Sequence, residues 1–379
     1  MIKYFISIFT LIKPRVYADK INKKPIPKSK KLKVKYNSLQ LRDKYIDSKT
    51  RLGKITKKTV DDYYKNITLV LDLYDNQDLN EMDRENAELI RDALSEYPKN
   101  KSKLKEFNKT IGFDVIDKNK ELKKDTLSPR RVKKIIHDFS GFCEWCFSHE
   151  YINKNYFYKL PTLPPRKNDI RHEFNDQQLT LIFNMEQYIK NRFKHPYYYW
   201  VPLLLRFTGA RLNEICQLHI KDIIELNGVH CIYIRDEQVG QTLKSRSSYR
   251  KIPIHNTLIN KGFIEFTKNC NSTMLFPELK LVNGYYSHNA SKWFSRRREK
   301  LGLSKGFDAH SFRHSFVNEL KQKGIKTELI QSIVGHSSNC ITLDVYGKSY
   351  EPQILLKAIS KISDEHVRHI QPYNKSQNI

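Results

Sequence analysis

A proline-rich segment near the middle of the chain separates two stretches with different hydrophobic patterns. Residues 161–167 hold three prolines and two basic residues. Before them, apolar residues recur every three to four positions, which is the spacing of amphipathic helices. After them the pattern is helical at first, and between residues 222 and 255 it falls to a period of two, as in strands. A chain of 379 residues with such a break is expected to form two domains joined by a linker over residues 161–172.

The first stretch is expected to form a small all-α domain over residues 36–160. Its apolar positions predict four helices, over residues 39–46, 60–73, 82–97 and 128–147. The last of these has a serine at the cap position and a proline at the first helical position, Ser128 and Pro129. Residues 99–126 are rich in lysine and asparagine and indicate an insertion or long loop. Residues 1–35 are expected to be a mobile basic lead.

The second stretch is expected to be an α+β domain over residues 173–365, followed by a tail over residues 366–379. It begins with a capping box, with Asn175 as cap and Gln178 three residues later. Three strands of an antiparallel sheet are predicted over residues 222–225, 229–235 and 251–255. Further helices are predicted over residues 197–207, 212–218, 257–267, 287–301 and 308–323. The fold class is therefore mostly α, with one small antiparallel sheet.

The charge of the chain indicates a polyanionic partner. The formal net charge is +27, with lysines and arginines spread along the whole sequence, and the isoelectric point is near 9.6. Nucleic acid is the leading candidate. An acidic membrane surface is the competing explanation. However, no window approaches the roughly 18 consecutive apolar residues of a membrane-spanning helix, and we expect no membrane partner.

The N-terminus and the cysteines indicate a cytoplasmic protein. Residues 1–12 are apolar enough to resemble the core of a signal peptide, but no small-residue cleavage site follows them. Cys143 and Cys146 form a CxxC pair without the second pair that a zinc site requires. We interpret them as packing, together with Trp145, on the buried side of a helix. Such cysteine usage fits a reducing compartment.

Six side chains in the second stretch form a constellation suited to phosphate chemistry. His310 and Arg313 lie three residues apart, after an Asp308 that is expected to cap their helix. The others are an arginine after a glycine turn, a lysine in the predicted hairpin tip, a histidine after a glycine and a tyrosine ten residues beyond it: Arg211, Lys244, His336 and Tyr346. Each of them alone is weak evidence, because such residues often form surface ion pairs or caps. Their order and spacing together carry the hypothesis.

The constellation resembles the catalytic domain of the tyrosine recombinases, the phage integrase family. That family has an arginine in a Thr-Gly-x-Arg turn, a lysine on a β-hairpin, His-x-x-Arg, Gly-His and then a tyrosine. Every position is filled here, by Arg211, Lys244, His310, Arg313, His336 and Tyr346, with Glu214 at the family's acidic position. Lys244 stands nine residues before Pro253, and Arg246 and Arg250 share its loop. The lysine-rich first stretch resembles in kind the family's core-binding, SAM-like DNA-binding domain.

The resemblance implies a site-specific DNA recombinase or integrase that works through a 3′-phosphotyrosyl intermediate. Tyr346 is then the nucleophile, with Tyr350 as the fallback, and Lys244 is the acid for the leaving oxygen. The arginines and histidines stabilise the phosphate and move protons. The arginines supply the positive charge, so we expect no metal and no cofactor. Because the phosphotyrosyl bond retains the energy of the broken bond, rejoining is expected to need no ATP.

The implied partners are double-stranded DNA recombination sites and further copies of the chain, as a dimer or tetramer on DNA. Accessory DNA-bending proteins are further candidates, and the family context is a mobile element or phage acting at the nucleoid. Two alternatives remain open at this stage. One is a type IB topoisomerase, and the other is a DNA-binding relic with an inactive site. An apolar helix after Pro352 is expected to dock either on its own domain or, as often in that family, on a neighbouring subunit.

Overall fold

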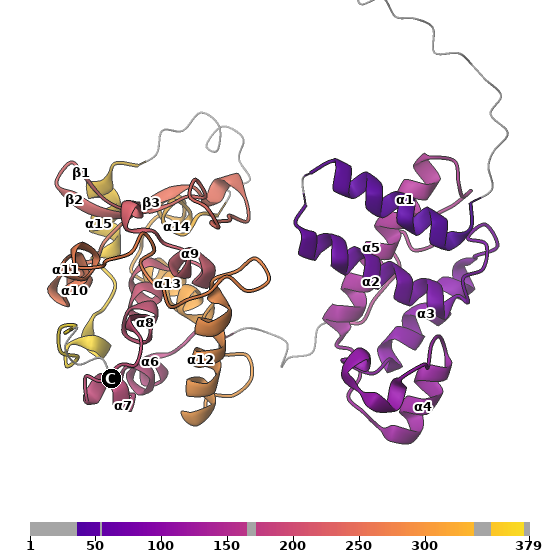
Figure 1. Cartoon of the computed structure of the whole chain (residues 1–379), viewed down its shortest axis with the longest axis horizontal. Coiled ribbons are helices and arrows are strands. Elements are labelled where there is room, and N and C mark those ends of the chain that lie inside the picture. The colour runs from indigo at the N-terminus through magenta and orange to yellow at the C-terminus, as the bar shows by residue number, and fades with distance from the viewer. Residues whose placement is uncertain (1–35, 54, 165–171, 337–349, 375–379) are drawn as a thin grey trace, which may run out of the picture.

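The chain contains two separate hydrophobic cores. The structure, a computed structural model, describes residues 36–53, 55–164, 172–336 and 350–374. One core gathers residues between Leu41 and Leu160, and the other gathers residues between Phe174 and Ile370. Figure 1 shows the two as separate bodies. Within the described ranges, no helix has both the length and the apolar character needed to cross a membrane.

The N-terminal body consists of helices. They are α1 (Ser38–Arg51), α2 (Lys57–Leu73), α3 (Arg84–Glu96), α4 (Asp114–Leu122) and α5 (Pro129–Ser148). The cap predicted for α5 is confirmed, since the Ser128 hydroxyl accepts a hydrogen bond from the backbone N–H of Arg131 at 3.3 Å. Cys143 and Cys146 are buried on α5 as expected, and burial raises the pKa of the Cys146 thiol to about 12.

The prediction of an insertion or long loop over residues 99–126 is wrong in part. This region forms two short turns, η1 (Lys101–Lys103) and η2 (Lys105–Phe107), and then α4. Phe107, Val115 and Ile116 are buried against the first core. Three apolar side chains are thus enough to fix a lysine-rich segment, and this body has five α-helices among its described residues instead of four.

The C-terminal body contains the remaining helices and one sheet. The helices that precede the sheet are α6 (Asp176–Phe183), α7 (Glu186–Ile189), α8 (Pro196–Thr208) and α9 (Leu212–Cys216), followed by the turn η4 (Ile220–Asp222). The strands are β1 (Ile223–Leu226), β2 (Val229–Ile234) and β3 (Arg250–Pro253), with the turn η5 (Arg246–Ser248) before β3. After the sheet come α10 (Asn256–Asn260), α11 (Phe263–Lys268), α12 (Ser287–Lys300), α13 (Ser311–Gln322), α14 (Thr327–Val334), α15 (Pro352–Ile359) and the turn η7 (Glu365–Val367).

The sheet is antiparallel with strand order β1-β2-β3, as the period-two pattern predicts. Ile232 of β2 pairs with Ile223 on one side and Ile252 on the other. Asn227 and Gly228 have φ values of 50° and 75°, which fit the two-residue hairpin turn expected from Asn-Gly. The sequence pattern therefore identified both the strands and their first turn.

Two predictions about the helices have different outcomes. The capping box at the start of α6 is confirmed: the Asn175 side chain accepts from the backbone N–H of Gln178, and the Gln178 side chain accepts from that of Asn175. The single helix expected over residues 257–267 is wrong. It is divided into α10 and α11 because Gly262 adopts a φ of 86°, which ends the first helix.

The chain beyond residue 350 packs on its own C-terminal body. Leu355, Ala358 and Ile359 of α15 are buried, and the core continues past the expected boundary at residue 365, since Val367 and Ile370 are also buried. Polar contacts hold the same segment. Arg206 donates to the carbonyl of Ser363 at 3.0 Å, and Tyr199 donates to the carbonyl of Gln371 at 2.8 Å. Lys261 donates to the carbonyls of Arg368 and Ile370. In the single chain that the structure describes, α15 thus packs on its own C-terminal body, and docking on a neighbouring subunit stays a prediction.

Gly209, between α8 and α9, is fixed by both its backbone and its surroundings. Its φ is 60°, and an added Cβ would lie 2.5 Å from the ring of Phe316. Gly209→Ala should therefore lower the free energy of unfolding by about 2 to 4 kcal/mol, through a left-handed alanine and an overpacked ring. Denaturant unfolding monitored by the fluorescence of Trp200 and Trp293 measures this.

A second glycine provides the matched control. Gly228 has a φ of 75°, and a Cβ added there meets nothing within 4 Å. Gly228→Ala should lower the free energy of unfolding by only about 1 to 2 kcal/mol, because the left-handed backbone is the one source of strain there. Equal losses in the two variants would mean that the contact with Phe316 has no effect.

Candidate active site

The turn between α8 and α9 positions the first arginine. The Thr208 hydroxyl accepts from the backbone N–H of Ala210 at 3.2 Å, and Gly209 supplies the left-handed residue that ends α8. Arg211 then stands at the cap position of α9. The carboxylate of Glu214 accepts from the backbone N–H of Arg211 at 2.9 Å and from its Nη1 at 2.6 Å. Glu214 thus holds both the main chain and the side chain of this arginine.

Arg313, on the first turn of α13, is buried next to that turn. The residue is 2% exposed, and its Nη1 donates to the carbonyl of Gly209 at 2.9 Å. Within the described part of the chain, its Nη2 has no hydrogen-bond partner. Burial, followed by the positive charges of Arg211 and Arg250, lowers its pKa to about 9, and Glu214 opposes this shift. A buried cation with an unused donor beside another arginine is well suited to bind an anion.

His310 lies immediately before α13. It occupies the cap position itself, and the carboxylate of Asp308 accepts from its backbone N–H at 2.7 Å. Asp308 therefore fixes the entry to the helix from two residues before His310, and is not the cap residue that the sequence indicated. The imidazole of His310 lies edge-on to that of His314, with ring centroids 5.1 Å apart. The expected spacing is preserved, with His310 one turn before Arg313.

His336 follows the end of α14. Gly335 closes that helix with a φ of 70°, and its carbonyl lies 3.5 Å from Nη2 of Arg211. Partial burial, and then the charges of Arg313, Arg211 and Arg250, lower the pKa of His336 to about 4. The imidazole is therefore neutral near pH 7, and it lies among guanidinium groups that disfavour a further positive charge.

One residue of the cluster was missed by the sequence reasoning. Arg250, named there only as a neighbour of Lys244 in its loop, is buried at the start of β3 and donates to Glu214 at 2.7 Å. Burial alone would raise the pKa of Glu214, but Arg250 and the backbone N–H of Arg211 outweigh it and hold that pKa below its ordinary value. The available signal was the strand alternation, which places Arg250 on the same inward side as Ile252.

The remaining predicted residues lie elsewhere or outside the described chain. Lys244 is exposed in the connection between β2 and β3, next to Leu243, which packs against the core. Tyr346 lies outside the described residues. The structure therefore brings together Arg211, Glu214, Arg313 and His336, with His310 one helical turn away.

The assembled groups form an electropositive site. Arg211, Arg250 and Arg313 carry three positive charges against the single negative charge of Glu214, which leaves a net charge of +2. Such a cluster binds a phosphodiester and stabilises the further negative charge that develops when an oxygen attacks it. Arg211 and Arg313 can donate to its non-bridging oxygens.

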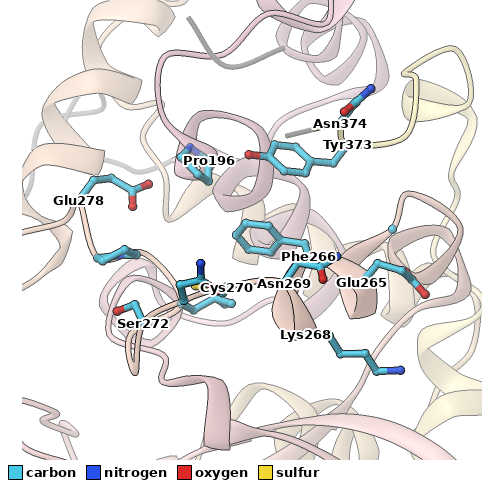
Figure 2. A pocket seen from close by; sticks show the side chains of 14 residues that line it. Pro196, Glu265, Phe266, Lys268, Asn269, Cys270, Ser272, Glu278, Tyr373 and Asn374 are labelled. Carbon is cyan, nitrogen blue, oxygen red and sulfur yellow. The ribbon is translucent and has the colours of Figure 1, made fainter. Parts of the chain in front are cut away.

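A cavity of about 850 Å³ lies in another part of the C-terminal body (Figure 2). Its walls include Phe266, Cys270, Glu278 and Tyr373, and it shares no residue with the cluster described above. Among the residues with described positions, no group of three histidine, cysteine or acidic side chains is arranged to hold a metal ion.

A comparison with known families identifies the C-terminal body. Residues 173–352 match the model of the phage integrase family, and this range contains every residue of the cluster. This is the catalytic domain of a tyrosine recombinase. The family expected from the residue spacing is thereby confirmed.

Similarity to individual proteins agrees with this assignment. A probable integrase/recombinase from Aquifex aeolicus is 25% identical over 276 residues, which is 65% of this chain and 83% of that protein. The matches to tyrosine recombinases from Pseudothermotoga lettingae, Pyrococcus furiosus and Pyrococcus horikoshii span only 46%, 46% and 48% of their lengths. The chain thus spans about half the length of these three relatives.

Solved structures share the fold. The integrase of the transposon Tn1549, in complex with circular intermediate DNA, has a TM-score of 0.55 at 20% identity, with 85% of this chain and 98% of that chain covered. A lambda integrase tetramer bound to a Holliday junction has a TM-score of 0.53 at 14% identity, with 80% and 79% covered. At these identities the likeness concerns the fold alone, and the expected fold class, mostly α with a small antiparallel sheet, is confirmed.

The depressed pKa of His336 predicts that proton uptake accompanies DNA binding by this recombinase domain. A bound phosphate offsets the arginine charges and should raise this pKa from about 4 toward its ordinary value. At pH 5.5 the imidazole of His336 is neutral in the free protein and partly protonated in the complex with DNA. Titration calorimetry in buffers with different ionisation enthalpies should detect about half a proton to one proton taken up per subunit.

The matched variants are His336→Asn and His314→Asn. The first should abolish the uptake, whereas the second, on the exposed side of α13, should retain it. Uptake that is unchanged in His336→Asn would assign the proton to another group.

Proposed function

We propose that this protein cuts and rejoins duplex DNA at specific sites through a covalent 3′-phosphotyrosyl intermediate. The observation that carries the proposal is the buried Arg313 next to Arg211, with a guanidinium nitrogen that no described protein group uses. An enzyme with this reaction needs fixed positive donors at the phosphate before the attack begins.

The reaction assigns one task to each residue of the constellation. The Tyr346 oxygen attacks the phosphorus, the bond to the 5′ oxygen breaks, and the phosphate stays attached to the tyrosine through its 3′ side. Arg211 and Arg313 donate to the non-bridging oxygens, and His336 donates to one of them from its neutral ring. His310 assists the loss of the tyrosine proton.

The leaving 5′ oxygen needs a proton, and Lys244 is the candidate acid. It is exposed in the connection between β2 and β3, so it is free to approach a bound DNA strand. Rejoining is the reverse attack by a 5′ hydroxyl, which releases the tyrosine. Because the arginines supply the positive charge and the phosphotyrosyl bond conserves energy, the cycle should proceed without added metal or ATP.

The partners of such an enzyme are DNA recombination sites and other copies of itself. The related structures include a lambda integrase dimer on a core site and a tetramer on a Holliday junction, and an integrase of a transposon. By analogy, this chain acts as a dimer or tetramer on paired sites of a mobile element, at the nucleoid. Accessory DNA-bending proteins are candidate partners of the same assembly.

Covalent capture tests the proposal and also finds the site. The purified protein is incubated with genomic DNA carrying its gene in the presence of EDTA, the reaction is stopped with denaturant, and DNA attached to protein is sequenced. A defined sequence attached through its 3′ phosphate is the expected result. No adduct, or cleavage only after Mg²⁺ is restored, would contradict the proposal. Relaxation of a plasmid that lacks the captured sequence would favour a topoisomerase.

The N-terminal body should supply much of the salt-dependent affinity for DNA. Deleting residues 38–158 removes a lysine-rich surface, and the logarithm of the binding constant falls with salt in proportion to the phosphates neutralised. The truncated chain should bind the captured site more weakly, with a shallower salt dependence in fluorescence anisotropy. An unchanged slope of the salt dependence would mean that these lysines face solvent and do not neutralise DNA phosphates.

A further inference from the structure

Arg250 uses three different nitrogens to join three parts of the catalytic domain. Its Nε donates to the carbonyl of Ile333 at 2.7 Å, its Nη1 to the carbonyl of Ser248 at 2.8 Å, and its Nη2 to the carboxylate of Glu214 at 2.7 Å. The side chain is 5% exposed. These acceptors belong to α14, to the turn before β3 and to α9, so a single guanidinium connects all three.

Two of these acceptors belong to residues that hold Arg211. Nη1 of Arg211 donates to the Glu214 carboxylate at 2.6 Å and to the Ser248 hydroxyl at 3.2 Å. Each side-chain partner described for Nη1 of Arg211 is therefore itself bonded to Arg250. If Arg250 shifted, both supports of Arg211 would be free to move.

The third acceptor fixes the end of α14. Ile333 lies two residues before Gly335, and a Cβ added to Gly335 would approach Nη1 of Arg250 to 2.9 Å. The helix end therefore packs directly on this guanidinium, which leaves room only for glycine. Because His336 follows Gly335, Arg250 also sets where the histidine enters the site.

The charge of Arg250 has a separate effect. Without Arg250, Glu214 would cancel one of the two positive charges of Arg211 and Arg313. The net charge of the site that faces a phosphate would then be +1. With Arg250 paired to the same carboxylate at 2.7 Å, the net charge is +2. Glu214 can thus orient Arg211 without weakening the attraction of the site for an anion.

We propose that Arg250 is a positioning residue of the recombination reaction, which fixes Arg211 and the end of α14 and keeps the site electropositive before DNA binds. This role rests on the proposed recombinase function. All three of its side-chain nitrogens donate to protein acceptors, so Arg250 acts through Arg211 and His336 and not on the DNA itself.

The decisive variant is Arg250→Lys, because lysine retains the charge but cannot reach three acceptors from one nitrogen. Cleavage is measured on two versions of the captured site, one with the natural scissile phosphate and one with an uncharged methylphosphonate at that position. Misplaced arginines matter most when the phosphate is charged. Arg250→Lys should therefore slow cleavage of the natural site by about 10- to 100-fold and of the methylphosphonate by less than about 3-fold. Binding of the site should be unchanged.

The matched control is Lys251→Met, the next residue of β3, which is exposed. It should cleave both substrates at the wild-type rate. Equal slowing of both substrates by Arg250→Lys, or no slowing of either, would overturn the proposal. If Arg250→Lys fails to fold, the pair Glu214→Gln with Arg250→Met, which removes both members of the buried Arg250–Glu214 ion pair together, is compared on the same substrates with the same two criteria.

A double-mutant cycle tests the route through Glu214. If Arg250 acts by holding that carboxylate, Arg250→Lys combined with Glu214→Gln should be no slower than the slower single variant. Fully multiplicative losses would mean that the two residues act independently.

A DNA-free crystal structure of Arg250→Lys separates this inference from the proposed function. A displaced Arg211 guanidinium is the expected result, and an unchanged one would overturn the positioning role. Failure of the wild-type protein to form any covalent adduct would contradict the proposed function, whereas this structure would still decide the role of Arg250.

Discussion

Replacing Tyr346 with phenylalanine should abolish the covalent protein–DNA adduct and leave site binding unchanged. The phenol oxygen is the proposed nucleophile, and phenylalanine removes only that atom. Loss of a nucleophile typically lowers the rate by about 10⁴-fold or more. Adduct formation on a nicked substrate of the captured site, followed on a denaturing gel, measures the loss, and a gel shift without denaturant measures binding.

Tyr350 provides the matched control. It is four residues away and 40% exposed, just before α15. Tyr350→Phe should form the adduct at the wild-type rate. The opposite pattern, an adduct with Tyr346→Phe and none with Tyr350→Phe, would show that the nucleophile is Tyr350.

Arg313→Ala should lower the cleavage rate by about 10²- to 10³-fold, with little effect on binding of the site. Its Nη2, which has no hydrogen-bond partner among the described residues, is available for the oxygen that gains charge in the transition state, and the loss of one such donor is typically worth about 3 to 4 kcal/mol. Single-turnover cleavage at saturating protein measures the rate. Addition of EDTA should leave the wild-type rate unchanged.

The same substitution should not destabilise the domain through its charge. The pKa of Arg313 is lowered to about 9, which means that the folded protein disfavours its positive charge compared with the unfolded chain. Arg206 differs, because it is equally buried but lies 2.6 Å from Glu319. Arg206→Ala leaves Glu319 with Lys323 as its one described cationic partner, 2.8 Å away, and removes the donor to the carbonyl of Ser363. It should therefore cost about 1 to 3 kcal/mol of stability, while its folded fraction cleaves normally. A comparable loss of stability in both variants would mean that Arg313 is structural.

The helix ends and turns that carry the constellation were predictable from the sequence, because residues close together in the chain determine them. His310 occupies the cap position of α13 and Arg313 lies on its first turn, and Gly209 and Gly335 each end a helix just before an active-site residue. Helix ends, capping boxes and a two-residue turn are determined by residues close in sequence. Such features therefore appear in a single sequence.

Arg250 could not be assigned in the same way, because its role depends on contacts across the fold. Its acceptors on α9 and α14 are 36 and 83 residues away in the chain. In the sequence it competed with Lys244 as one basic residue of a polar loop. The structure separates the two, since Arg250 is buried in the site and Lys244 is exposed. A strand pattern with a charge on its inward side was the one local indication.

The helix α4 was missed for a related reason. Its sequence is dominated by charged and polar residues, and its buried apolar residues are only Val115 and Ile116. Two apolar residues do not establish a helical period, so tertiary packing against Phe107 and the first core decides its structure.

The position of the last core residues has a consequence for synthesis of the chain. The N-terminal core is complete at Leu160, so this body can fold while the rest of the chain is still on the ribosome. The catalytic core requires Ile359, Val367 and Ile370, which are made long after Leu160. A nascent chain therefore gains its first folded body long before it has a complete active site.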